Sequence, residues 1–137
     1  MSGLDEIAVQ VESGPTAPTA QVQAILSEIE TLLRLLQESG EPGGIDLRSL
    51  PLFPGDYEAL VEALGEGEVS ATVRALGPTE VRETAVPGVW WTIHRNEGDE
   101  VVAELIEVTK CPDILCTPPE DLDEALERLA SLRGRGD

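Results

Sequence analysis

The sequence has little positive charge. Nine Lys and Arg stand against 27 Asp and Glu in 137 residues, which gives a formal net charge of −18, and the first basic residue is Arg34. Because such a chain repels phosphate groups, we expect no nucleic-acid partner and no binding to anionic membrane surfaces. No run approaches the ~20 apolar residues of a membrane-spanning helix, so we expect no membrane insertion. Residues 1–20 lack the basic region of a signal peptide, which predicts a cytoplasmic protein.

Side chains that bind metals or act as nucleophiles are also few. The chain has one histidine, His94, and two cysteines, Cys111 and Cys116, in the stretch CPDILC. This spacing lacks the second ligand pair of a structural zinc site, and a cytosolic location disfavours a disulfide. We therefore expect semi-buried or incidental thiols and no bound metal or cofactor. The alternative is a metal- or iron–sulfur-cluster-handling assembly factor that uses these three residues and nearby carboxylates.

Common enzyme motifs are missing as well. The sequence contains neither G-x-S-x-G nor HExxH, and no Lys-Ser or Lys-Thr follows Gly65 and Gly67 as a phosphate-binding loop would require. Catalytic groups can assemble from distant positions, so a small hydrolase or isomerase is a second alternative, although no site for one is identifiable. The prediction is a protein that is not an enzyme.

Length and an apolar content of 41% fit one domain. Residues 1–20 combine a strand-like IAVQV with the Pro-rich ESGPTAPTA, and we expect a flexible arm there, followed by a single α+β domain over 21–137. Apolar spacing predicts helices over 21–38, from about 56 to 64, and within 117–136. Thr19 and Gly40 are the expected caps of the first helix. The expected buried stripe of the last helix comprises Leu122, Ala125, Leu126 and Leu129.

A β-type pattern occupies residues 68–109. Four strand-like runs, EVSATVRAL, TEVRETAV, GVWWTIHRN and DEVVAELIEVT, are joined by short links. Short links favour an antiparallel meander over parallel crossovers. The Gly- and Pro-rich segment 39–56 is expected to be an irregular connector. The predicted fold is therefore α+β, with an antiparallel sheet of about four strands and helices packed on one face.

Two tryptophans are adjacent in the third of these runs. Since neighbouring strand residues point to opposite faces, Trp91 is expected to join Val89 and Ile93 toward the helices, and Trp90 to join His94 on the other face. We expect Trp91 to be buried and Trp90 to be at least partly accessible. The alternative is that the connector or the N-terminal arm covers Trp90. An accessible indole is typical of binding hot spots.

Four blocks of the chain resemble a known family. GEPGGIDLRSLPLFPGD, LGEGEVSATV, VRETAVPGVWW and VVAELIEV are similar to the hydrogenase expression/formation protein family of the HupH/HyaF type. The resemblance covers about residues 22–132 and corresponds to one of the two related units that members usually carry. It implies an accessory chaperone or scaffold for the small subunit of an uptake [NiFe] hydrogenase before export. It also implies a possible thioredoxin-like companion chaperone.

The implied partner suggests where binding takes place. A small-subunit precursor carries a twin-arginine signal peptide, which is basic and then apolar, and an acidic protein with an apolar patch is complementary to it. The expected partner-binding residues are Trp90 and His94 on the sheet, with acidic groups that steer the basic end of the peptide: Glu66, Glu68, Glu80 and Glu83.

Overall fold

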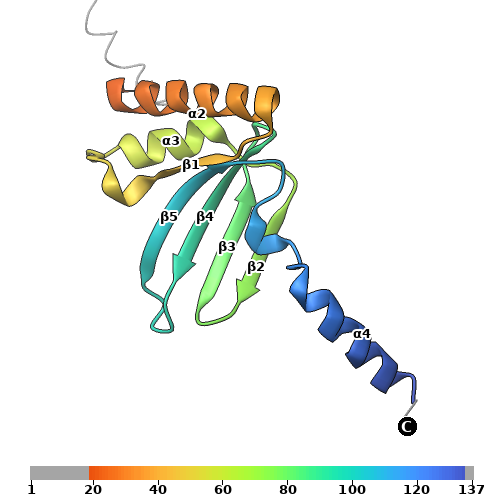
Figure 1. Cartoon of the computed structure of the whole chain (residues 1–137). Coiled ribbons are helices and arrows are strands. Elements are labelled where there is room, and N and C mark those ends of the chain that lie inside the picture. The colour runs from red at the N-terminus through yellow and green to blue at the C-terminus, as the bar shows by residue number, and fades with distance from the viewer. Residues whose placement is uncertain (1–18, 135–137) are drawn as a thin grey trace, which may run out of the picture.

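A computed structural model describes residues 19–134 and shows a five-stranded sheet with helices (Figure 1). The elements in chain order are α2 (Ala20–Ser39), β1 (Gly43–Asp46), η1 (Leu47–Ser49), α3 (Asp56–Leu64), β2 (Ser70–Arg74), β3 (Pro78–Glu83), β4 (Val89–Arg95), β5 (Val101–Val108), η2 (Asp113–Leu115) and α4 (Glu120–Leu132). Apart from Thr19 and Ala20, the predicted N-terminal arm lies outside the described residues.

The sheet has the strand order β1-β5-β4-β3-β2, and every pair is antiparallel. The predicted α+β class and the four-strand meander are confirmed, with one strand more than expected. The extra strand, β1, lies in the segment predicted to be an irregular connector and pairs with β5 at the edge of the sheet. Gly44 is closely packed there, because a Cβ atom on it would lie 3.1 Å from the carbonyl oxygen of Ile106.

The caps of α2 agree with the sequence pattern. The Thr19 hydroxyl accepts a hydrogen bond from the Val22 N–H at 3.1 Å, and Gly40 ends α2 in the left-handed conformation at φ 78°. Asp56, the first residue of α3, is buried and accepts hydrogen bonds from the Thr19 hydroxyl at 2.8 Å and the Phe53 N–H at 2.9 Å. This carboxylate therefore fastens the start of α3 to the start of α2.

The main core lies between these two helices and one face of the sheet. Its sheet side includes Val89, Trp91 and Ile93 of β4, and its helix side includes Val22 and Leu60. Figure 1 shows α2 and α3 across one end of the sheet, with β2 to β5 extending beyond them. Part of the helix-facing side of the sheet is thereby left for a groove next to α3.

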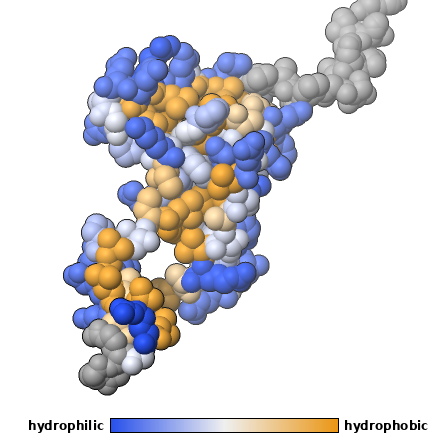
Figure 2. Space-filling view, turned by 90° about the vertical axis from the view of Figure 1, so that its right-hand side faces the viewer, coloured by the Kyte–Doolittle hydropathy of each residue, from blue (hydrophilic) through white to orange (hydrophobic). Residues whose placement is uncertain are grey.

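The last helix does not pack as predicted. In Figure 1 α4 projects away from the sheet, and none of its residues is buried. Leu126 is 68% exposed, and Leu122, Leu129 and Leu132 are also exposed, so Figure 2 shows apolar side chains on the surface of this helix. The periodicity predicted an apolar face correctly, but periodicity alone does not supply a surface that covers it.

Within residues 19–134, no helix combines the length and the apolar character that crossing a bilayer requires.

A candidate partner-binding groove along α3

Three side chains from three elements meet where α3 approaches the sheet. The Trp91 indole N–H donates to Glu104 Oε2 at 2.7 Å, and the Tyr57 hydroxyl donates to the same oxygen at 2.5 Å. The two rings meet edge to face, with centroids 5.6 Å apart and planes at 88°. Trp91 is 4% exposed, which confirms the predicted burial. The cluster therefore holds α3 against β4 and β5.

The environment of Tyr57 alters its acidity. Burial raises the pKa of Tyr57 to about 12, and the hydrogen bond and charge of Glu104 act in the same direction. Loss of the phenolic proton would place a second negative charge beside the carboxylate. The hydroxyl therefore stays a donor throughout the neutral range.

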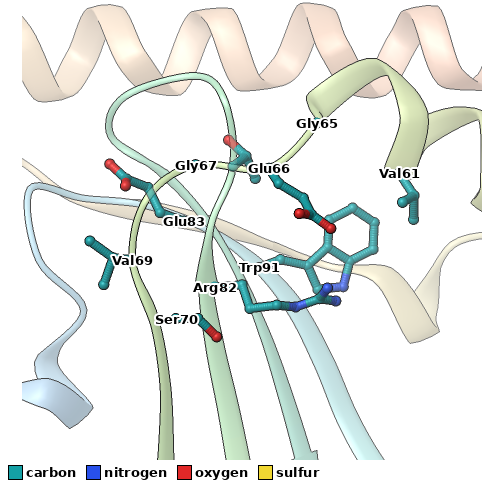
Figure 3. A pocket seen from close by; sticks show the side chains of 10 residues that line it. Val61, Gly65, Glu66, Gly67, Val69, Ser70, Arg82, Glu83 and Trp91 are labelled. Carbon is teal, nitrogen blue, oxygen red and sulfur yellow. The ribbon is translucent and has the colours of Figure 1, made fainter.

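On one side of Trp91 lies a cavity of about 270 Å³, between the C-terminal end of α3 and the strands β2 to β4. In Figure 3 the Trp91 ring lies between Val61 of α3 and the side chains of Arg82 and Glu66. Val69 and Glu83 complete the outer wall. The cavity thus combines an aromatic floor with apolar and charged walls.

Two glycines shape the loop that forms the rim of this cavity. Gly65 ends α3 at φ 66°, a conformation that favours glycine. Gly67 passes so close to β3 that a Cβ atom would lie 2.4 Å from the Thr84 carbonyl oxygen, and its N–H donates to the Glu83 carbonyl at 2.8 Å. Glu66, between them, is thereby held at the wall of the cavity.

On the other side of Trp91 lies a second, more open cavity of about 490 Å³. Phe53, Tyr57, Glu58 and Glu104 line it. Tyr57 and Glu104, which line the second cavity, both contact Trp91, which lines the first. We call the combined surface the α3 groove, defined by Phe53, Tyr57, Glu58, Val61, Glu66, Val69, Arg82, Glu83, Trp91 and Glu104.

The α3 groove is apolar along one wall and mainly acidic around it. Phe53, Tyr57, Val61 and Val69 are all exposed large hydrophobic residues, and Phe53 is 69% exposed. Two arginines are the exceptions in charge. Arg48 lines the second cavity, and Arg82 lines the first, with an Nε atom that is buried and has no hydrogen-bond partner among the described residues. A guanidinium can donate hydrogen bonds to carbonyl or carboxylate oxygens of a bound chain.

The structure places the predicted acidic residues at different points. Glu66 and Glu83 line the same cavity, and Glu68 is held next to them because its N–H donates to Glu83 Oε1 at 3.2 Å. Glu80 lies further along β3, 4.0 Å from the Arg95 side chain, and does not line the groove. Three of the four predicted carboxylates therefore gather at one end of the α3 groove.

The other two predicted residues lie on the opposite face of the sheet. His94 Nδ1 shares a hydrogen bond of 2.9 Å with the Thr79 hydroxyl. Trp90 is only 7% exposed, which contradicts the expected accessibility, and its indole N–H donates to the Thr109 carbonyl at 3.1 Å. Strand alternation gave the correct face, but the chain that follows β5 folds back over this indole. The tryptophan that borders a cavity is Trp91.

Of the two expectations for the cysteines, semi-buried or incidental thiols, the structure contradicts the first. Cys111 and Cys116 are both exposed, with free thiols whose sulfur atoms are 3.8 Å apart. Across the part of the chain that the structure describes, no three His, Cys, Asp or Glu side chains come together as a metal site would require.

Comparison with known proteins identifies relatives of this chain. Residues 19–134 match the family described as "HupH hydrogenase expression protein, C-terminal conserved region". The hydrogenase expression/formation protein HoxQ of Azotobacter vinelandii is 37% identical over 92 residues, which cover 67% of this chain and 32% of that protein. HupH of Rhodobacter capsulatus is 34% identical over 85 residues, which cover 62% of this chain and 31% of that protein. The chain thus spans about a third of the length of these curated relatives.

A solved structure shows the same fold over nearly its whole length. The hydrogenase expression protein HupH from Thiobacillus denitrificans superposes with a TM-score of 0.81 at 42% identity, covering 86% of this chain and 98% of that chain. The sequence match and this structural match agree with the four sequence blocks that resemble the HupH/HyaF type. The chain belongs to the HupH family of hydrogenase expression proteins.

Proposed function

We propose that this chain is a non-catalytic accessory protein of [NiFe] hydrogenase maturation that binds the small-subunit precursor in the cytoplasm. The α3 groove binds the twin-arginine signal region of that precursor. The observation that carries the proposal is the continuous surface of exposed apolar side chains next to acidic ones. Family membership supports the process, since the relatives are named as hydrogenase expression/formation proteins.

The apolar wall suits the hydrophobic part of a signal peptide. Tyr57 and Val61 lie four residues apart on α3, and Phe53 precedes the helix by three residues; all three are exposed. Burial of such surface contributes about 25 cal/mol per Å² before the costs of association. An extended or helical apolar segment laid along this wall would cover side chains that are otherwise in contact with water.

The acidic end suits the arginines. Glu66 and Glu83 flank one cavity, Glu58 and Glu104 line the other, and the net charge of −18 attracts a basic peptide from a distance. Arg82 lines the first cavity, and its guanidinium can donate hydrogen bonds to backbone carbonyls of the peptide. The proposed role of a chaperone follows: the groove holds an export signal until the subunit is complete.

Paired variants test whether the groove is the binding surface. Phe53→Ala removes an exposed groove side chain, whereas Leu76→Ala removes one that is 81% exposed in the turn between β2 and β3, outside both cavities. Binding of a synthetic twin-arginine signal peptide should weaken by about tenfold for Phe53→Ala, the loss of about 1.4 kcal/mol, and should be unchanged for Leu76→Ala. Equal binding by both variants would exclude the groove as the site.

Two variants that each remove one negative charge test the acidic end of the groove in the same assay. Glu66→Gln should slow association and reduce its dependence on salt, because rim charges act mainly on the association rate. Glu97→Gln, in the exposed turn between β4 and β5, is the matched control with the same loss of charge. Identical effects of the two substitutions would indicate attraction by net charge alone.

A further inference from the structure

The chain between β5 and α4 forms a tight turn that brings two cysteines together. The N–H groups of Leu115 and Cys116 donate to the carbonyls of Pro112 and Asp113 at 3.0 and 2.9 Å. Pro112 is fully buried, which anchors the turn to the body of the protein. Cys111 and Cys116 therefore lie on the same side of the turn, with their sulfur atoms 3.8 Å apart.

The two thiols are placed for bond formation. Both are exposed and free, and both lie near the Pro112 carbonyl oxygen, at 3.8 and 3.6 Å. The sulfurs of a disulfide are about 2.0 Å apart, so these sulfurs need to approach by about 1.8 Å from their present 3.8 Å. A displacement of this size is within the reach of side-chain rotation, and exposure gives an external reactant access.

We propose that Cys111 and Cys116 are a redox-active pair that forms a reversible intramolecular disulfide by exchange with a low-molecular-weight disulfide. The Cys111 thiolate attacks one sulfur of the external disulfide, forms a mixed disulfide and displaces the first thiolate. The Cys116 thiolate then attacks Cys111 Sγ and displaces the second. Two electrons pass from the protein to the external disulfide, and the two protons lost by the cysteines complete its two thiol products.

The contact between the thiols assigns the order of attack. The Cys116 thiol donates a hydrogen bond to the Cys111 sulfur, and this bond, together with the nearby charge of Asp113, raises the pKa of Cys116. Because Cys116 holds its proton more tightly than an ordinary thiol, it is assigned the second, resolving attack. Both steps require thiolates, so the exchange accelerates as the pH rises.

The position of the pair also gives oxidation a structural effect. The turn separates the end of β5 from the start of α4 at Glu120. A bond between Cys111 and Cys116 closes the turn covalently at the base of the projecting helix. Oxidation therefore restrains the segment that presents the exposed leucines of α4.

The test uses the full chain, reduced and freed of reductant, then incubated with excess glutathione disulfide and analysed by intact mass after alkylation of remaining thiols. The wild type should lose two hydrogens and retain no glutathione, and dithiothreitol should reverse the change. Cys116→Ser should accumulate one glutathione adduct on Cys111, and Cys111→Ser should react more slowly. Two stable adducts on the wild type, or covalent dimers, would overturn the proposal. Faster reaction of Cys111→Ser would contradict the assigned order.

An unfolded control separates pairing by the fold from pairing by proximity in sequence. In a glutathione redox buffer, the equilibrium constant for the disulfide should be larger in the folded protein than in guanidinium by about tenfold or more, since closing the loop costs the unfolded chain entropy. Equal constants would show that the folded turn does not hold the thiols together. Hydrogen exchange at Thr117, Glu120 and Asp121, the backbone amides on either side of Pro118 and Pro119, should be slower in the oxidised protein, and unchanged exchange would remove the link to α4.

Discussion

Tyr57 of α3 meets Trp91 of β4 edge to face, with ring centroids 5.6 Å apart, and both side chains donate to the same oxygen of Glu104. This arrangement does two things at once. It packs α3 against the sheet at the border of the main core. It also connects Trp91, which lines the first cavity, with Tyr57 and Glu104, which line the second. A substitution of Trp91 would therefore change both the core and the first cavity of the α3 groove.

Removal of Trp91 should be costly. Trp91→Ala should lower the free energy of unfolding by about 3–5 kcal/mol, because it leaves a cavity in the core and removes one of the two hydrogen bonds that Glu104 Oε2 accepts. Urea denaturation measures the loss. Trp91→Phe keeps most of the packing and is the control that isolates the hydrogen bond. If Trp91→Ala lowers the free energy of unfolding by less than about 1 kcal/mol, the buried position of Trp91 is contradicted.

Tyr57 is the only tyrosine, so its ionisation can be followed directly by ultraviolet absorbance. Its pKa should be found near 12, and Glu104→Gln should move it down toward the ordinary value of 10.0. Because the pKa is raised in the folded state, the associated stability is fully present below pH 10 and is lost as the pH rises toward 12. Tyr57→Phe should lack this part of the pH dependence. An unshifted pKa would show that the hydroxyl does not donate to Glu104.

The exposed position of α4 predicts a contrast between two leucines. Leu126→Ala should change the free energy of unfolding by no more than about 0.5 kcal/mol, as is usual for surface substitutions. Leu60→Ala, at a position with 0% exposure, should cost about 2–5 kcal/mol. Denaturant titration of the two variants under the same conditions gives the comparison. A large loss at Leu126 would mean that the helix packs against the protein in solution.

Both indoles should be shielded from solvent. Acrylamide should quench the single-tryptophan variants Trp90→Phe and Trp91→Phe to a similar, small extent, because the remaining indole is 4% or 7% exposed. Strong quenching in Trp91→Phe would show that the chain after β5 leaves Trp90 uncovered in solution.

Local signals in the sequence predicted much of the fold. The caps at Thr19 and Gly40, the start of α3 at Asp56 and its end at Gly65 depend on backbone chemistry within a few residues. Strand alternation likewise placed Trp91 in the core. Each of these features depends on residues at, or next to, the position where it occurs.

Features that depend on distant chain segments were not predictable in the same way. Strand β1 has the sequence GGID, and because glycine has a low β propensity the residues alone do not indicate a strand. The strand forms by pairing with the edge of β5. Trp90 is covered by chain that folds back after β5, and α4 finds no cover among the described residues. The α3 groove joins Tyr57, Trp91 and Glu104 from three elements, and no pattern of spacing in the sequence connects them.

The most direct test of the account compares the precursor and the processed form of the hydrogenase small subunit. Association and dissociation rates of both with this chain should be measured side by side at several salt concentrations. The precursor should bind, Phe53→Ala should act mainly on dissociation, and added salt should mainly slow association, since charges steer over a screening length of roughly 8 Å at physiological salt. The processed form should bind at least about 100-fold more weakly, a difference of about 2.7 kcal/mol. Equal affinity for the two forms would contradict recognition of the signal region.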